Sequence, residues 1–472
     1  MTIYYLDPSA ATNGTGSQAN PLNTTIGLAL SFNDSLLIKT GTVMREVIQN
    51  CLNNIGITVG SYGTGDAPKL VGNIQLDTSK CVYVPAYDCY AAAFQFNGTV
   101  QSPVAVVDGV IKLTSSTTQA VPAASVAYLP RESRTTSFSN QLGNITQDGE
   151  PLVFVPWAGN LADTVNNAPS TSHTSSGKKL DAEGRFSYDY TNNVMYFKPV
   201  GGSLNGVEFS VSVLPFGLVT AWPHATLARK LTVRDIDVYG QSRHGISAQY
   251  RKEVVIDNVL AEMIGGAWDG SSVYYGNGIE LTYGCDDSSV SNLTGIDIFD
   301  TVATAQLYDV VGSSIRRQDW TNIKAVGCGL SAFELSLQNG KSTGNTYFGC
   351  GVIEHVNVYN LELDNSQDMW ATGRGGSGYL MINNSGAGSR IHNNKLFGFK
   401  AKSNNKGAVI NSARTAGTNG FTDVAASGFV YGVSSAIASM PQTDVLSRCD
   451  FGGATNNFPS GDTTLTASQI LE

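Results

Sequence analysis

The sequence predicts an all-β solenoid, a fold in which short strands and turns repeat and stack along one direction. Three observations predict it: a short motif recurs, a second short strand follows most copies, and the composition is rich in turn residues. By length alone, 472 residues would suggest about three globular domains. The length of a solenoid does not indicate its number of domains, because a solenoid becomes longer by adding coils.

The recurring motif is a large apolar residue, any residue, Asp or Asn, and then an aliphatic residue. Copies begin at Val233, Ile256, Val290, Trp320 and Val358. Four of them are followed by a second short strand, at residues 245–249, 278–282, 305–308 and 332–336. Each copy with its second strand therefore predicts one coil of the solenoid.

Apolar and polar residues alternate in the second strands, and this alternation assigns each side chain to a face. Ile279 and Leu281 point one way, whereas Glu280 and Thr282 point the other. We expect the apolar set inside and the polar set outside. The residues predicted to be interior are Val233, Ile246, Ile256, Ile279, Leu281, Leu293, Leu307, Phe333 and Leu335. Stacking then predicts one outer column of Ser247, Glu280, Gln306 and Glu334, and a second column of Gln249, Thr282, Tyr308 and Ser336.

Composition supports this interpretation and excludes some functions. The chain has 51 Gly, and only 14% of its residues are charged. Tight turns need Gly and Asn, which tolerate positive φ. The formal net charge is −9 without a basic run, which argues against nucleic acid and anionic membranes as partners. No stretch approaches the roughly 18 apolar residues of a membrane span, so membrane insertion is not expected.

Cysteine usage and the N-terminus predict the compartment. The seven Cys are scattered without a Cys-x-x-Cys pair, which predicts reduced thiols in the core. The residues after Met1 lack a basic region followed by an apolar run, so no signal peptide is expected. We expect synthesis in a cytoplasm and release by lysis, unless a signal has been removed.

The pattern along the chain predicts five regions. An N-terminal cap with a short helix near residues 25–31 is expected at 1–50, and the first coils at 51–115. A hairpin-rich insertion follows at 116–224, then the main coils at 225–414 and a C-terminal cap at 415–472. The insertion is expected to pack on the flank of the solenoid or to form one wall of a carbohydrate groove.

The opening of the chain carries a resemblance to a known superfamily. The run Ile-Thr-Val-Gly-Ser-Tyr-Gly-Thr-Gly at residues 57–65, with Pro68 after it, resembles the start of pectate-lyase-like proteins. The resemblance covers residues 1–115 and 225–415. It implies a single-stranded right-handed parallel β-helix solenoid, here with an inserted hairpin-rich region and small end caps. The motif is specific for this fold but not for one chemistry, because lyases, hydrolases and epimerases share it.

The resemblance also implies a biological setting. The superfamily includes polysaccharide-cutting enzymes and phage tailspike depolymerases. By that likeness we expect a homotrimer in a virion tail, acting outside the cell on a bacterial capsular or O-antigen polysaccharide.

Other catalytic motifs are not found in the sequence. The five His residues are isolated and lack metal-ligand spacing. No Gly-x-Ser-x-Gly elbow or Walker loop occurs, so no metal or cofactor is expected. An esterase triad stays open, because a triad is recognised by geometry rather than by order.

Paired carboxylates on the outer column point to carbohydrate chemistry. Glu280 and Glu334 lie two coils apart, which places their backbones roughly 9–10 Å from each other. Inverting glycosidases separate their two carboxyl groups by roughly 6.5–9.5 Å, whereas retaining ones need roughly 5–5.5 Å. The spacing favours inversion and leaves open which Glu is the acid. Asp269, Asp286 and Glu262 are the alternative carboxylates, and a neighbouring subunit is another source.

Several side chains are candidates for binding the sugar. Trp268, Tyr274 and Tyr275 lie in a loop next to Glu280 and suit sugar stacking, although loop packing is their ordinary role. Arg316 and Arg317 suit an acidic sugar, with a solvated turn as the plainer interpretation. The remaining candidates are His244, as a proton carrier, and the outer-column residues Gln306 and Tyr308.

Three functions remain open from the sequence. The first is a glycoside hydrolase with two carboxylates. The second is a polysaccharide lyase, which needs a base and a cation to neutralise a uronate. The third is a binding spike without catalysis. The absence of a basic cluster around the Glu column mildly favours the hydrolase.

Overall fold

A computed structural model gives the structure of the 472-residue chain. It describes residues 1–52, 54–95, 118–120, 142–155, 157–167, 179–189, 192–220, 228–268, 274–282, 284–309, 314–339, 351–366, 377–383, 390–403, 408–413, 419–427, 431–435, 445–450 and 455–457.

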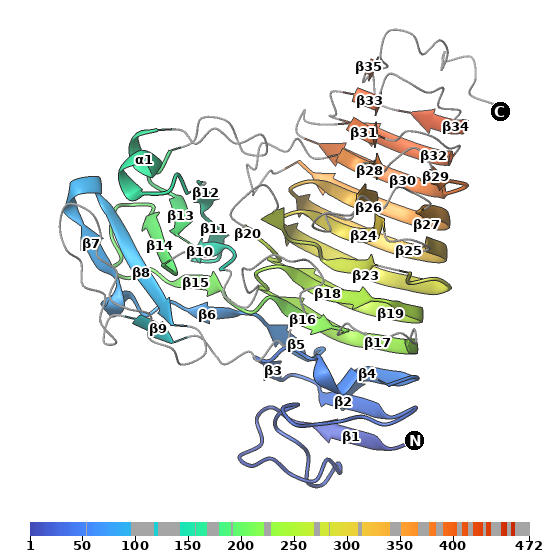
Figure 1. Ribbon diagram of the computed structural model, residues 1–472, viewed down its shortest axis with the longest axis horizontal. Coiled ribbons are helices and arrows are strands. Elements are labelled where there is room, and N and C mark those ends of the chain that lie inside the picture. The colour runs from blue at the N-terminus through green and yellow to red at the C-terminus, as the bar shows by residue number, and fades with distance from the viewer. Residues whose placement is uncertain are drawn as a thin grey trace.

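Two long parallel sheets form the body of the molecule (Figure 1). From β16 onward the chain adds a strand to each sheet in turn, so that one long and one short strand make a coil. The long sheet contains β1 (Ile3–Leu6), β2 (Ser35–Lys39), β3 (Val43–Met44), β4 (Ile57–Tyr62), β5 (Lys69–Val71), β17 (Ala228–Tyr239), β19 (Arg251–Glu262), β23 (Ser288–Ile298), β25 (Ser314–Cys328), β27 (Val352–Asn365), β29 (Arg390–His392), β30 (Lys395–Ser403), β32 (Gly420–Ser427) and β34 (Val445–Asp450). The short sheet contains β16 (Phe216–Val219), β18 (His244–Gln249), β22 (Ile279–Thr282), β24 (Thr301–Asp309), β26 (Ser331–Asn339), β28 (Ser377–Asn383), β31 (Ala408–Ala413), β33 (Tyr431–Ser435) and β35 (Thr455–Asn457). The prediction of an all-β chain with stacked parallel strands is confirmed.

The recurring motif marks a bend in each long strand. Asp235, Asn258, Asn292, Asn322 and Asn360 all have left-handed backbones, with φ between 53° and 57°. Asn and Asp adopt this conformation more readily than other non-Gly residues. Their side chains also bond from coil to coil: Asn322 Nδ2 donates to Asn292 Oδ1 at 3.0 Å, and Asn360 Nδ2 donates to Asn322 Oδ1 at 3.0 Å. The Asn and Asp residues of the motif therefore form a row, the Asn ladder, at which the long strands of successive coils bend in the same place.

The interior of the body is a stack of apolar side chains from both sheets. Inward positions of neighbouring short strands are in register, as in the pairs Ile246–Ile279 and Ala303–Phe333. All nine residues predicted to be interior are at most 1% exposed: Val233, Ile246, Ile256, Ile279, Leu281, Leu293, Leu307, Phe333 and Leu335. The predicted core is thus confirmed.

The inserted region begins at residue 73, earlier than the expected residue 116. It contains a four-stranded sheet of β6 (Asn73–Gln75), β10 (Ile145–Gln147), β11 (Glu150–Pro151) and β15 (Phe209–Ser212). A six-stranded sheet follows, with β7 (Val82–Val84), β8 (Cys89–Gln95), β9 (Thr118–Ala120), β12 (Val153–Phe154), β13 (Arg185–Asp189) and β14 (Val194–Lys198). Its helices are α1 (Leu161–Asn166) and the 3-10 turns η2 (Thr78–Lys80) and η3 (Pro85–Tyr87).

The boundary was misplaced because short strands look alike in a coil and in a mixed sheet. Strand β8 pairs antiparallel with β14, and apolar clusters cover both of its faces. The inserted region stands to one side of the body, beside its middle strands (Figure 1).

Both predicted end caps contain strands of the body. β1 and β2 pair in parallel and continue into β4, and residues 25–31 form a turn instead of the expected helix. The 3-10 turn η1 (Asn50–Leu52) follows. At the other end, β32 to β35 extend both sheets where a cap was expected. Among the described residues, no helix is long and apolar enough to cross a membrane.

The first prediction tests the interior register. Ile279 is fully buried between the rungs of Ile246 and Ala303. Ile279→Ala should lower the free energy of unfolding by about 2–4 kcal/mol, because a cavity replaces the lost methyl groups. Denaturant titration measures this loss, and a change below about 0.5 kcal/mol would contradict the register.

Candidate functional site

Four polar side chains form a column on the outer face of the short sheet. Strand pairing places Ser247 beside Glu280, Glu280 beside Thr304, and Thr304 beside Glu334. The predicted pair of Glu residues therefore does share a column, two rungs apart. Thr304 lies between them instead of the expected Gln306.

The register of β24 explains this correction. Gln306 pairs with Thr282 and Ser336, and Tyr308 pairs with Gln338 instead of joining the second column as expected. A shift of two residues keeps every side chain on its predicted face, because the strand period is two. Alternation within the strand therefore identifies the face but not the rung partners. The side chain of Tyr308 lies outside the described residues.

The column is buried, although the sequence predicted an exposed polar face. Glu280 and Glu334 are each only 5% exposed, and Gln306 is 8% exposed. The pKa of Glu280 is raised to about 7, mainly by burial and to a smaller extent by the nearby Asp300 carboxylate. The Ser247 hydroxyl and the Arg243 guanidinium lower the same pKa and partly offset the effect of burial.

A chain of hydrogen bonds fixes one oxygen of Glu280. The Gln249 side chain donates from Nε2 to Ser247 Oγ at 3.0 Å. Ser247 Oγ in turn donates to Glu280 Oε2 at 2.7 Å. The same Oε2 lies 3.7 Å from His244 Nε2. Ser247 and His244 thus both face one oxygen of the carboxyl group.

The second carboxylate is anchored in a similar way. Thr304 Oγ1 lies 3.4 Å from Glu334 Oε2 and 3.4 Å from the backbone oxygen of Glu334, and it donates to both. A hydroxyl on an adjacent rung therefore faces each of the two Glu side chains.

Glycines bring the turns before β18 and β22 close together. A Cβ at Gly245 would lie 2.5 Å from the backbone oxygen of Gly278, so the close approach requires glycine there. His244, the first residue of β18, and Asn277, in the turn before β22, precede these glycines. The backbone N–H of Asn277 donates to His244 Nδ1 at 3.1 Å.

Arg243 belongs to this cluster and was not predicted as a site residue. It is 3% exposed, and its guanidinium lies 5.6 Å from the ring centre of Phe216. Arg243 also lowers the pKa of His244, after the larger effect of burial. The signal in the sequence was its position next to His244, just before a short strand.

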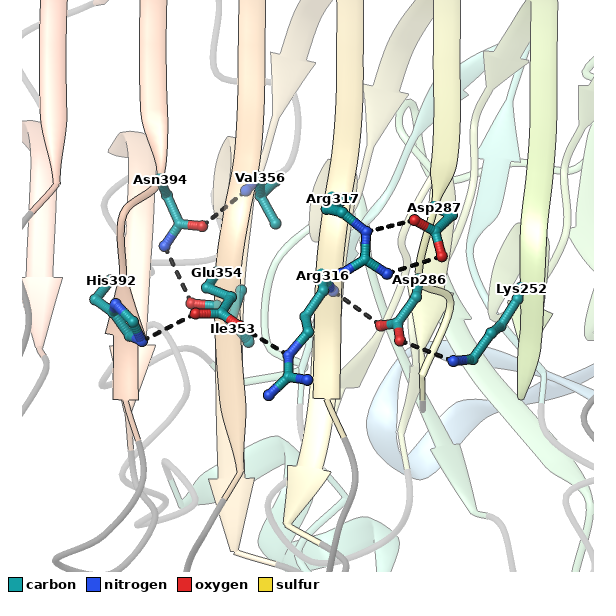
Figure 2. A network of polar contacts seen from close by, with 10 residues as sticks. All are labelled: Lys252, Asp286, Asp287, Arg316, Arg317, Ile353, Glu354, Val356, His392 and Asn394. Carbon is teal, nitrogen blue, oxygen red and sulfur yellow. Dashed lines mark hydrogen bonds and ion pairs between the residues drawn. The ribbon is translucent and has the colours of Figure 1, made fainter.

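Arg316 and Arg317 lie on the long sheet with carboxylate partners (Figure 2). Arg317 donates from both Nε and Nη2 to Asp287, with Nη2 2.9 Å from Oδ2. Arg316 Nε lies 2.8 Å from Glu354 Oε1. Their contact with an acidic sugar stays a prediction. In the structure they contact oppositely charged side chains on neighbouring strands, and we call this row of contacts the charge ladder.

The charge ladder crosses five rungs with mostly alternating sign (Figure 2). Lys252 Nζ lies 3.2 Å from Asp286, and Asp286 Oδ1 accepts from the backbone N–H of Arg316 at 2.9 Å. Beyond Arg316, Glu354 Oε2 lies 3.4 Å from His392 Nε2. The alternative carboxylate Asp286 is therefore held by partners in this ladder.

Glu262 lies where the inserted region meets the long sheet. Its Oε2 is 3.9 Å from Lys69 Nζ. The pKa of Asp297 is raised to about 6, mainly by burial and then by the carboxylates of Glu262 and Glu150. Glu150 is in β11 of the inserted region, so carboxylates from two parts of the fold affect Asp297. The structure thus groups Glu262 with Asp297 rather than with Glu280.

The aromatic loop is described only in its backbone. β20 (Ala267–Trp268) pairs antiparallel with β21 (Tyr274–Tyr275). Asp269 and the side chains of Trp268, Tyr274 and Tyr275 lie outside the described residues. Among the residues that are described, no group of three or more His, Cys, Asp or Glu is arranged to hold a metal ion.

Comparison with known proteins gives structural similarities only. No protein-family model matches the chain, and no curated protein is similar to it in sequence. The complex of XylC with xylose is 10% identical at a TM-score of 0.44, over 94% of this chain and 69% of that one. A GH136 lacto-N-biosidase from Eubacterium ramulus is 10% identical at 0.36, over 97% and 67%. The tailspike protein gp49 from Pseudomonas phage LKA1 is 10% identical at 0.21, over 92% and 70%. These values are too low to carry an argument about activity.

The second prediction concerns the carboxylates around Asp297. A raised pKa in the folded state means that stability is fully present below the unfolded pKa, near 3.8, and is lost as the pH rises through about 6. Asp297→Asn should therefore raise the free energy of unfolding at pH 7.5 by about 1–2 kcal/mol, since partial solvent exposure reduces the full effect. At pH 4.5, which lies between 3.8 and about 6, the gain should fall to roughly one third of its value at pH 7.5.

Thermal unfolding at the two pH values measures this difference. Asp235→Asn is the matched control, because it keeps an acceptor for Asn258 Nδ2 in the Asn ladder. An equal gain at both pH values would contradict the prediction.

Proposed function

We propose that the chain is a right-handed parallel β-helix glycoside hydrolase that cuts a polysaccharide, with Glu280 as general acid and Glu334 as general base. One observation carries the proposal: the carboxyl of Glu280 is buried, has a pKa of about 7, and lies two rungs from Glu334 in one column. Two carboxylates in different protonation states are what glycoside hydrolysis requires.

The surroundings of Glu280 assign it the role of acid. A pKa of about 7 keeps a large share of this carboxyl protonated near neutral pH. Oε2 accepts the hydrogen bond from Ser247, so the exchangeable proton belongs on Oε1. Oε1 would then give its proton to the leaving glycosidic oxygen as the bond to the sugar breaks.

Glu334 takes the complementary role. Two rungs separate the backbones by roughly 9–10 Å, which leaves room for a water molecule between the side chains. Glu334 would remove a proton from this water as its oxygen attacks the anomeric carbon, which inverts the configuration. In the adjacent column Gln306 lies between Thr282 and Ser336, and its partly exposed amide suits a hydrogen bond to a sugar hydroxyl.

A lyase needs a base, and His244 lies beside Glu280, with its Nε2 3.7 Å from Glu280 Oε2. Its Nδ1 accepts a hydrogen bond from Asn277, and burial lowers its pKa well below the ordinary value. The lone pair of the neutral ring is therefore already used, and the other nitrogen carries the proton. This arrangement favours hydrolysis over β-elimination.

The substrate and setting follow from the resemblance of the opening residues. We propose a bacterial surface polysaccharide as substrate and a homotrimeric phage tailspike as the assembly. Light scattering of the full chain at micromolar concentration should give the mass of a trimer, and a monomer would contradict the proposed assembly.

The third prediction tests the catalytic pair. Glu280→Gln and Glu334→Gln should each reduce turnover by at least about 100-fold, because each removes one arm of acid–base catalysis. Substrate binding and melting temperature should change little. Reducing-end release from a panel of capsular and O-antigen polysaccharides measures turnover.

Glu362→Gln is the control, because Glu362 is an exposed carboxylate on the long sheet. Near wild-type turnover in both site variants would place the chemistry elsewhere. Ultraviolet absorbance of an unsaturated sugar would identify a lyase, and binding without any product would identify a non-catalytic spike.

A further inference from the structure

The contacts of His244 define the position of its proton. The backbone N–H of Asn277 donates to His244 Nδ1 at 3.1 Å, so Nδ1 is bare. Burial and the neighbouring Arg243 both disfavour the charged ring. A neutral imidazole carries one proton, which must then be on Nε2. This nitrogen lies 3.7 Å from Glu280 Oε2.

We propose that His244 is a positioning residue whose Nε2–H, oriented by the backbone of Asn277, holds Oε2 of Glu280 and leaves Oε1 to face the substrate. The inference rests on the proposed function, because it assigns a role within that site. It differs from a proton carrier, since His244 keeps its proton throughout.

The charges around Glu280 support a donor role for His244. Arg243 precedes it in the turn before β18, Asp300 is in the turn before β24, and Glu334 lies two rungs away on β26. Ser247 on β18 already donates to Oε2 at 2.7 Å. A second donor near the same oxygen would hold the carboxyl in one rotation, and distances of this kind shorten when substrate binds.

The 3.7 Å separation is longer than an ordinary hydrogen bond, so its effect must be measured. Loss of an N–H donor disfavours the carboxylate form of Glu280. His244→Phe should therefore shift the basic limb of the kcat/KM profile upward by roughly half a pH unit, and it should lower kcat with little change in KM. His244→Gln keeps an N–H donor and should restore much of the wild-type profile.

The chain offers a matched control on its other sheet. His392 Nε2 lies 3.4 Å from Glu354 Oε2, a second His–Glu pair that belongs to the charge ladder. His392→Phe should leave the pH profile unchanged. An unmoved limb in His244→Phe, or an equal shift in His392→Phe, would overturn the proposal.

A measurement without substrate separates this inference from the proposed function. A protonated carboxyl gives an infrared band, and the band that is absent from the spectrum of Glu280→Gln belongs to Glu280. The pH midpoint at which this band is lost should rise in His244→Phe. A rise without any glycosidase activity would overturn the proposed function and keep the inference. Activity with an unmoved midpoint would overturn the inference alone.

The wild-type chain provides a further test if the Phe variant fails to fold. Nitrogen-15 spectra of the five His, assigned with single His→Gln variants, should show a neutral ring with its proton on Nε2 and a bare Nδ1 for His244. The signal should be the one lost in His244→Gln. A proton on Nδ1 of His244, or a charged ring at neutral pH, would overturn the proposal.

Discussion

The body depends on each long strand bending at the same positions in every coil. Left-handed residues recur five apart along these strands, as at Glu253 and Asn258 or Arg317 and Asn322. Such a backbone costs an ordinary residue roughly 1–2 kcal/mol, so Asn and Asp reduce a cost that every coil would otherwise repeat. The amide of Asn322 donates to one neighbour and accepts from the other, which lets the ladder continue in one direction. Each exposed bond contributes little by itself, but together they align the coils and thereby decide which residues share a column.

Charged side chains have different neighbours on the two sheets, and this difference gives the short sheet its candidate site. On the long sheet, Glu354 has Arg316 on one adjacent rung and His392 on the other. On the short sheet, the rungs adjacent to Glu280 carry the hydroxyls of Ser247 and Thr304 instead of cations. A buried carboxyl without a cation on either rung is easier to protonate, which agrees with the raised pKa of Glu280. Strand register, set by the bends, thus controls the chemistry of the outer face.

The sequence predicted the features that depend on periodicity. The motif identified the coils, alternation identified the core, and Glu280 and Glu334 were placed on one column of one face. Periodicity did not predict the rung partners of Gln306, because a shift of two residues leaves the pattern unchanged. Nor did it show that the outer face is buried, since that depends on contacts from outside the strand. The inserted region was placed too late for a related reason: β8 is a short apolar run, as a coil strand can be, but it pairs antiparallel with β14.

Burial makes Glu280 an acid but also sets a limit on how strongly its proton can be held. After proton transfer the carboxylate must exist for a time in the same buried position, where an unpaired charge is costly. The Ser247 hydroxyl and the Arg243 guanidinium stabilise that charge and lower the pKa, whereas burial and Asp300 raise it. Much stronger donors would leave Glu280 ionised before the reaction, and much weaker ones would prevent it from releasing the proton. A pKa of about 7 is the balance of these opposing effects, and it allows the same group to give up a proton and recover it near neutral pH.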